Sequence, residues 1–112
     1  MKEPFLKNGI PTLKIEKEKD VDGYTLIDVR QPDEYVGELG HIPGASLCTL
    51  GPSLQEYLTT ADQDKPILFI CRSGVRSANA TAFALQMGFK KVVNMEGGMI
   101  GWNETGLKTI KE

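Results

Sequence analysis

The sequence has few residues of the kinds that mark several large classes of protein. Its 112 residues include two cysteines, one histidine and one tryptophan. Two cysteines in a chain of this size do not make a disulfide framework, and they favour a reducing, cytoplasmic setting. No charged segment followed by an apolar stretch opens the chain, so we expect no secretory signal. The longest uninterrupted apolar run, residues 67–71, is far too short to span a bilayer.

An excess of charge of either sign is also missing. Lys and Arg number 13 against 15 Asp and Glu, for a net charge of −2, which excludes a general nucleic-acid binder. The charge is unevenly placed, because residues 31–64 hold six acidic and no basic residues, whereas residues 65–112 hold seven basic and three acidic ones. The positive excess suits a small anionic ligand better than a long polyanion. Solvated surface charge explains the same asymmetry, so it does not identify a site by itself.

Length and composition favour a single compact domain. The hydrophobic fraction is 40% and the charged fraction 25%, which are ordinary values for a globular protein and argue against a disordered or fibrous chain. We therefore expect one domain over residues 1–112, with a core from about residue 10 to about residue 107 and with frayed ends.

Five short runs predict strands of a parallel sheet. Residues 67–71 (ILFIC) are continuously apolar, which suits a strand that is buried on both faces of such a sheet. The other four runs are residues 12–15, 25–29, 46–50 and 91–95.

Helical patterns separate these runs. Residues 54–61 carry apolar side chains at helical spacing, with Ser53 as the N-cap. Residues 77–87 are rich in alanine and are followed by Gly88, which can end a helix. Shorter helices are expected at residues 33–36 and 99–104. The alternation predicts an α/β domain of three layers, with a central parallel sheet of about five strands and helices on both faces.

The loop after the most buried strand carries the strongest functional signal. Ligands of parallel α/β sheets bind beyond the carboxyl ends of the strands, where Cys71 is followed by Arg72-Ser73-Gly74-Val75-Arg76 and a helix. Backbone amides at a helix N-terminus and nearby arginines stabilise a thiolate. Gly74 allows the positive φ angle that turns successive amides inward. We therefore expect Cys71 to be ionised at neutral pH and nucleophilic.

Other roles for Cys71 fit the sequence less well. A cysteine at a strand end is often only a small buried hydrophobic residue, but a core position gives no reason for arginines at 72 and 76 around Gly74. A Cys-His hydrolase lacks its partner, since the only histidine, His41, lies in a predicted turn, where a structural hydrogen-bonding role is expected. The two cysteines and His41 have no metal-ligand spacing, and a Gly-Lys-Ser/Thr nucleotide loop is absent.

Four motifs, in order, resemble those of the rhodanese family of sulfurtransferases. They are LIDVR at 26–30 followed by Glu34-Tyr35, GHIPGA at 40–45, CRSGVRS at 71–77, and Gly97-Gly98 followed by Trp102. Together they span most of the chain. The resemblance implies a rhodanese-like three-layer fold and a single-domain sulfurtransferase.

The resemblance also implies a two-step covalent cycle at Cys71. The thiolate takes a sulfane sulfur from a small anionic donor such as thiosulfate, or from a persulfide, and a thiol or cyanide acceptor then removes it. The amides of residues 72–76 would hold the negative charge of the persulfide. Arg72 and Arg76 would hold the anionic end of the donor, Arg76 the more directly. Neither a cofactor nor a metal is implied, and the acceptor can be a protein thiol, with no nucleic acid or membrane as a partner.

Several side chains are expected to support this site or the core. Asp28 and Arg30 end a neighbouring strand, and we favour an ion pair or loop-bracing hydrogen bonds over direct substrate contact. Ser77 is also expected to support the loop.

Three further side chains and one segment are expected to have structural roles. Trp102 and Phe83 are expected in the core, and Cys48 is expected to be buried and inert on its strand rather than to form a disulfide with Cys71. Residues 16–23 are short and highly charged where rhodaneses usually have a helix, so that helix is predicted to be truncated or missing.

Two rival functions stay open. A cysteine phosphatase or arsenate reductase of the same fold has five residues between Cys and Arg, whereas four separate Cys71 from Arg76 here, and the shorter loop suits a single sulfur atom. A non-catalytic interaction module is the other rival, because fold alone does not fix function. Such modules typically lose the cysteine that this chain keeps.

Overall fold

The computed structural model describes residues 1–112 and contains one six-stranded sheet in the order β1-β2-β6-β5-β3-β4. Five of the strands are parallel, as predicted, and β1 is antiparallel to β2. The strands are β1 (Phe5–Lys7), β2 (Ile10–Leu13), β3 (Thr25–Asp28), β4 (Ser46–Leu47), β5 (Ile67–Ile70) and β6 (Val92–Met95).

The sequence analysis missed β1. Its sequence, Phe5-Leu6-Lys7, is too short to show the alternation of apolar and polar residues from which a strand could be predicted, and all three residues are exposed. What forms the strand is the turn, where Asn8 and Gly9 have φ angles of 53° and 79°. Two successive positive φ angles make the tight turn that joins twisted antiparallel strands, and Asn-Gly is its favoured sequence. The hairpin also moves the next strand, which begins at Ile10 rather than at the predicted residue 12.

All four predicted helices are present, with changes at their starts. They are α1 (Pro32–Tyr35), α2 (Pro52–Thr60), α3 (Val75–Gln86) and α4 (Gly98–Glu104). Helix α2 begins at Pro52, so Ser53 lies inside it and is not the N-cap, because proline fits the first helical turn. Helix α3 begins two residues earlier than predicted, directly after Gly74. None of these helices has the length and apolar character needed to cross a membrane.

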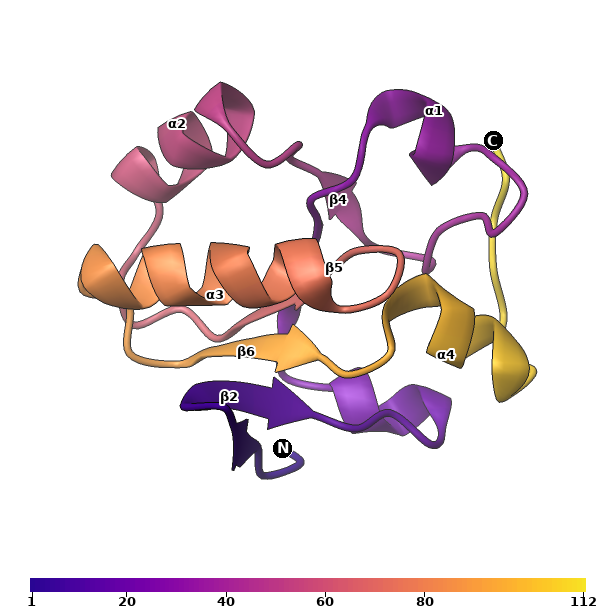
Figure 1. The fold of residues 1–112 in the computed structure, drawn as a ribbon, viewed down its shortest axis with the longest axis horizontal. Coiled ribbons are helices and arrows are strands. Elements are labelled where there is room, and N and C mark those ends of the chain that lie inside the picture. Colours follow the sequence, from indigo (N-terminus) through magenta and orange to yellow (C-terminus); the bar gives the residue numbers. More distant parts are fainter.

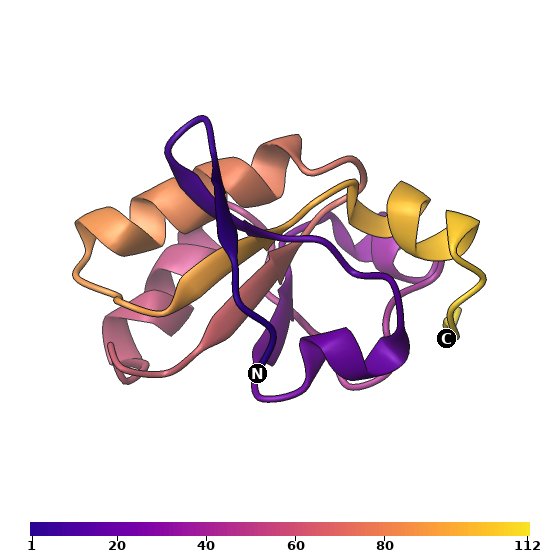
Figure 2. The same ribbon diagram turned by 90° about the horizontal axis from the view of Figure 1, so that it is seen from below.

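Two hydrophobic clusters lie on the two faces of the sheet. Successive residues of β5 alternate between them, with Ile67 and Phe69 on one face and Leu68 and Ile70 on the other. Helices α2 and α3 pack on the first face, whereas α4 and the charged segment pack on the second. Figures 1 and 2 show the sheet between these layers. The predicted three-layer α/β architecture is thus confirmed.

The charged segment before β3 forms only one turn of 3-10 helix, η1 (Glu18–Val21). The predicted truncation of the first helix is therefore present in the structure. Asp20 accepts hydrogen bonds from the backbone amides of Glu16 and Lys17, and these bonds lower the pKa of its carboxyl group. The turn is thus held by one side chain rather than by a longer helical ladder.

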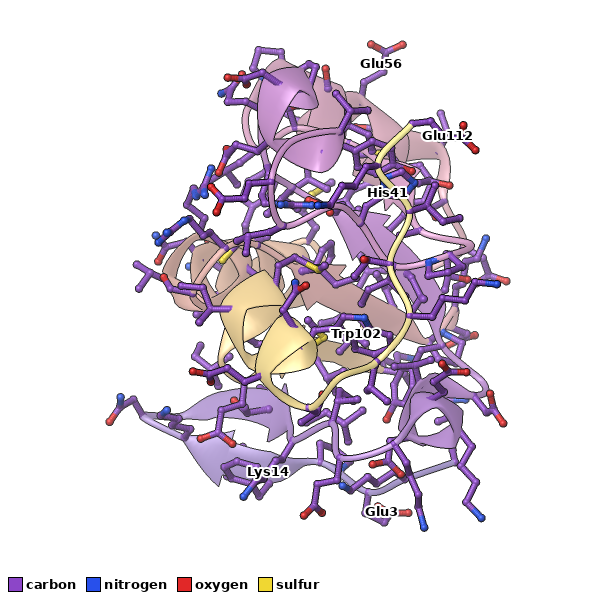
Figure 3. All side chains as sticks on the ribbon, turned by 90° about the vertical axis from the view of Figure 1, so that its right-hand side faces the viewer. Glu3, Lys14, His41, Glu56, Trp102 and Glu112 are labelled. Carbon is purple, nitrogen blue, oxygen red and sulfur yellow. The ribbon has the colours of Figure 1, made fainter.

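Segments near both ends of the chain are paired with the rest of the domain. Strand β1 bonds to β2, and near the other end Ile110 exchanges both backbone hydrogen bonds with His41, at 2.8 and 2.9 Å. The indole of Trp102 donates to the Lys108 carbonyl at 2.9 Å, and Figure 3 shows Trp102 between α4 and this C-terminal segment. Backbone pairing of this kind cannot be read from the local sequence, because its partners are distant in the chain.

Candidate active site

Strand β5 delivers Cys71 to the carboxyl edge of the sheet. The four residues before it are buried, and the Cys71 side chain continues into the cluster beneath α2 and α3, with 1% of the residue exposed. The chain then turns through Gly74, whose φ of 103° favours glycine, and enters α3. In Figure 1 this loop lies between α1 and α4, at the end of the sheet toward which the parallel strands point.

Two hydrogen-bond donors, one in the loop and one in α3, lie within reach of the Cys71 sulfur. The Gly74 amide donates to Sγ at 3.0 Å and the Ser77 hydroxyl lies 3.2 Å from it. The amides of the other early residues of the loop and helix donate to no acceptor in the protein; they are those of Arg72, Ser73, Val75 and Arg76. A set of unpaired amides at the start of a helix stabilises a negative charge. The loop is therefore built to hold an anion on or beside the sulfur.

The start of α4 holds the carbonyl groups of the same loop. Met99 donates its amide to the Cys71 carbonyl at 2.8 Å, and Ile100 donates to the Arg72 carbonyl at 3.1 Å. Gly98 makes this contact possible, since a Cβ atom there would lie 2.5 Å from backbone atoms of Cys71 and Arg72. The Gly-Gly motif thus fixes two loop carbonyls against α4, which leaves the loop amides for the ligand.

Asn94 in β6 is a site residue that the sequence analysis missed. Its amide nitrogen donates to the Gly74 carbonyl at 3.2 Å, and its Oδ1 accepts from the Ser77 hydroxyl. With one proton, Ser77 donates either to Asn94 or to the Cys71 sulfur. Asn94 is buried, with 6% exposed, and its two hydrogen bonds hold Gly74 and Ser77, the two residues that contact the sulfur. The available signal was a single polar residue within an otherwise apolar strand.

Asp28 and Arg30 form the ion pair that the sequence analysis favoured. The carboxylate and guanidinium meet at 2.8 Å with 0% and 1% of their side chains exposed. Arg30 also donates to the carbonyls of Glu34 at 3.1 Å and Gly40 at 2.7 Å. A buried charge is stable only when it is paired and hydrogen-bonded. The pair therefore braces α1 and the segment after it beside the loop.

Arg76 is engaged in a way that the sequence analysis did not foresee. Its guanidinium donates to both carboxylate oxygens of Glu34, at 2.7 and 2.8 Å. This contact lowers the pKa of Glu34 from 4.5 to about 2, with a further contribution from the Gln31 amide. The hydrogen-bonding fork of Arg76 is thus occupied in this structure, and a direct contact of Arg76 with an anionic donor stays a prediction. The two residues are 42 positions apart, so no local pattern indicated the pair.

A cleft of 190 Å³ opens beside this pair. It is lined by Arg30, Glu34, Glu38, Leu39 and Arg72. Arg72 is exposed and forms no ion pair, so it is the one arginine of the loop that is available to a ligand. A larger cavity of 490 Å³ lies between η1 and the end of α4, but it contains neither Cys71 nor any residue of its loop. The smaller cleft, in contrast, is bordered by Arg72 of the Cys71 loop.

His41 has the structural role expected of it. Its ring stacks on Tyr35 with centroids 3.6 Å apart, and Nδ1 lies 2.8 Å from the Tyr35 carbonyl. Tyr35 in turn donates its hydroxyl to the Ala45 carbonyl. These contacts connect α1 to the segment before β4.

The other marked residues lie in or beside the core. Trp102 is buried, as predicted, whereas Phe83 is half-buried at the edge of the cluster under α3. The prediction for Cys48 is wrong in two respects, since β4 ends at Leu47 and Cys48 is only half-buried. Strand β4, which Cys48 follows, lies at the edge of the sheet and pairs only with β3. Partial burial raises the pKa of the Cys48 thiol.

Comparison with known proteins assigns the family. A family model for the rhodanese-like domain matches residues 13–105. The chain belongs to the rhodanese-like family. It is 48% identical to "Putative sulfurtransferase YtwF" of Bacillus subtilis over 90 residues, which cover 80% of this chain and 82% of that protein. It is 30% identical to "Thiosulfate sulfurtransferase GlpE" of Pseudoalteromonas translucida over 91 residues, or 81% of each chain.

Solved structures of rhodanese-like proteins have the same fold. A rhodanese-related protein from Thermoplasma volcanium superimposes with a TM-score of 0.73 at 33% identity, covering 84% of this chain and 90% of the other. A protein of unknown function from Rhodopseudomonas palustris, described as "Possible Tyrosine Phosphatase", gives a TM-score of 0.77 at 30% identity, covering 91% and 86%. The chain is thus a rhodanese-like domain by sequence and by fold, and its named relatives place it among sulfurtransferases.

Proposed function

We propose that this rhodanese-like protein transfers sulfane sulfur and carries it on Cys71 as a persulfide. The observation that carries the proposal is the sulfur itself, which faces the Gly74 amide and the Ser77 hydroxyl at 3.0 and 3.2 Å. The other amides of the same loop, those of Arg72, Ser73, Val75 and Arg76, have no protein acceptor. Such donors stabilise a thiolate before transfer and a persulfide anion after it.

In the first half-reaction the Cys71 thiolate attacks the outer sulfur of a donor. With thiosulfate, the new bond joins Cys71 Sγ to that sulfur, the donor S–S bond breaks, and sulfite leaves with the electron pair. The product is the Cys71 persulfide anion, so charge and atoms balance without an oxidant or a cofactor. With a persulfide donor R–S–SH, the leaving group is the thiolate R–S⁻ and Cys71 gains S–SH.

In the second half-reaction an acceptor removes the outer sulfur. Cyanide attacks it and leaves as thiocyanate, or an acceptor thiolate attacks it and becomes a persulfide. In both cases the S–S bond to Cys71 breaks and its thiolate is restored. The amides and Ser77 favour this step because they stabilise the leaving thiolate.

Phosphoryl transfer fits the site less well. An arginine that binds a phosphate needs a free planar fork of donors, and that of Arg76 is occupied by both oxygens of Glu34. The loop also places only four residues between Cys71 and Arg76. A loop of that size encloses one sulfur atom more readily than a tetrahedral oxyanion.

The test is the intact mass of the reduced protein after incubation with thiosulfate or with a hydropersulfide. We expect a gain of one sulfur atom, which cyanide then removes as thiocyanate. Cys71→Ser should gain none. Cys48→Ser is the matched control, because Cys48 is the only other cysteine and lies outside the loop, and it should load like the unsubstituted protein.

Three results would contradict the proposal. Loading of Cys71→Ser would assign the sulfur to Cys48 or to no specific site. If neither donor loads the protein and the protein hydrolyses a phosphate ester, the phosphatase rival is favoured. Failure of all three reactions would favour a non-catalytic interaction module.

A further inference from the structure

We infer that Glu34 is a specificity-determining residue, which withholds Arg76 from the donor and so directs the site to persulfides of low charge rather than to thiosulfate. The inference rests on the proposed sulfur transfer and deepens it. It concerns which donor the cleft accepts, whereas the proposal above concerns whether Cys71 carries sulfur at all.

The first support is the geometry of the pair. Glu34 lies on α1 and Arg76 in the second position of α3, and two hydrogen bonds of 2.7 and 2.8 Å join their side chains. A third bond, from the Gln31 amide to Glu34 at 3.0 Å, fixes the carboxylate from its own helix. A bidentate pair that is braced in this way competes strongly with any anionic ligand.

The second support is the charge that remains at the cleft. Two carboxylates, those of Glu34 and Glu38, line it. Arg30 is committed to Asp28, so only Arg72 offers an unpaired positive charge. Glu34 is ionised near neutral pH, and the hydrogen bonds from Arg76 lower its pKa further, to about 2. A thiosulfate dianion therefore meets one unpaired cation, Arg72, and one unpaired carboxylate, Glu38, while the charges of Arg76 and Glu34 offset each other.

A hydropersulfide makes a smaller electrostatic demand. Its sulfane group carries at most one negative charge, which the loop amides can hold. When the Cys71 thiolate attacks R–S–SH, the S–S bond breaks and R–S⁻ leaves, so no dianion forms in the cleft. Thiosulfate, in contrast, brings two charges in and releases sulfite, which carries two charges out. Removal of the Glu34 charge should free the Arg76 guanidinium for the sulfonate oxygens.

The test compares two donors on three forms of the protein. The rate of Cys71 loading is measured with sodium thiosulfate and with cysteine hydropersulfide, and kcat/KM is determined for each. Glu34→Gln keeps the size of the side chain and an oxygen for the Gln31 amide but removes the charge. Asp33→Asn is the matched control, because it removes the same charge from the same helix at an exposed residue that does not line the cleft.

We expect Glu34→Gln to raise kcat/KM for thiosulfate at least about tenfold, the effect of one charge-assisted hydrogen bond made available to the donor. Loading from cysteine hydropersulfide should change less than about twofold, and Asp33→Asn should leave the ratio of the two donors unchanged. An equal change for both donors, no change for either, or the same shift in Asp33→Asn would overturn the inference. Circular dichroism of each variant checks that it is folded. If no form loads from either donor, the proposed function itself fails, which is a different result.

Discussion

Single residues around Cys71 divide into those that touch the sulfur and those that hold these in place. Gly74 and Ser77 touch it. Asn94 touches neither the sulfur nor the cleft, yet it forms hydrogen bonds with both Gly74 and Ser77. It is therefore a positioning residue, and its effect should appear in the chemistry more than in donor binding.

Replacing Asn94 with alanine tests this role. We expect the kcat of Cys71 loading to fall about tenfold to hundredfold with little change in KM, because Ser77 and the Gly74 carbonyl lose their anchor and small displacements near a nucleophile are costly. The free energy of unfolding should fall by about 1–3 kcal/mol, since two buried groups lose a partner.

A matched variant separates positioning from stability. Thr12 is also buried and donates its hydroxyl to the Ile10 carbonyl at 2.8 Å, and this hydroxyl forms no hydrogen bond with the loop. Thr12→Val should lower stability while kcat stays near that of the unsubstituted protein. If Asn94→Ala loads sulfur at the original rate, Asn94 is only a structural residue.

At the scale of elements, the site depends on the contact between the loop after β5 and the start of α4. That contact has no room for a side chain at Gly98, whose φ is 56° and whose neighbours are backbone atoms. The two amides at the start of α4 bond to the carbonyls of Cys71 and Arg72. A change at Gly98 therefore acts on the sulfur through the backbone.

Gly98→Ala should lower both activity and stability. We expect the free energy of unfolding to fall by about 2–4 kcal/mol, from overpacking against backbone added to the strain of a positive φ. Sulfur loading should be lost in the fraction that stays folded, as measured by intact mass.

Gly106→Ala is the control for this change. Gly106 also has a positive φ, of 76°, but nothing lies within 4 Å of the position of a Cβ atom. It should show only the strain, about 1–2 kcal/mol, and retain loading. Equal effects of the two substitutions would mean that the contact with the loop is unimportant.

The elements also show how far sequence reasoning reaches. Strand β5 and helix α3 were predictable because each has a strong local pattern, continuous apolar residues in one and alanine-rich helical spacing in the other. Strand β1 has no apolar pattern and depends on its turn. Cys71 and its loop could likewise be predicted, since strand, cysteine, glycine and helix are adjacent in the chain.

The residues that escaped prediction act over long sequence distances. Glu34 and Arg76 are 42 positions apart, and Asn94 is 17 positions from Ser77. Their proximity follows from the order of the strands in the sheet, which places β5 between β3 and β6. The unequal distribution of charge was visible in the sequence, but its partial explanation, an ion pair between the acidic and basic parts, needed the fold.

At the scale of the whole molecule, the Glu34–Arg76 pair links α1 to α3 and so makes stability depend on pH. The folded-state pKa of Glu34 is about 2, against an ordinary value of 4.5. A group whose pKa is lowered by folding stabilises the protein above its unfolded pKa and loses that effect as the pH falls toward the folded value.

Urea unfolding of the protein and of Glu34→Gln at a series of pH values tests this linkage. We expect the unsubstituted protein to be more stable by about 1 kcal/mol near neutral pH, a value reduced by the partial exposure of the pair. The difference should be constant above about pH 5 and shrink steadily toward pH 2. Asp33→Asn should show no comparable trend. A difference that persists unchanged at the lowest pH would show that the pair does not stabilise the fold through its charge.

If Cys71 carries sulfur as proposed, its burial affects how the sulfur reaches an acceptor. With 1% of the residue exposed, the bare thiol is recessed within the protein wall, and a bulky reagent meets the loop first. Persulfide formation adds one atom at a bond length of about 2 Å, so the loaded protein reaches further than the empty one. The outer sulfur of the persulfide would therefore be easier for an acceptor to reach than the Cys71 sulfur itself, and only the loaded protein would present it.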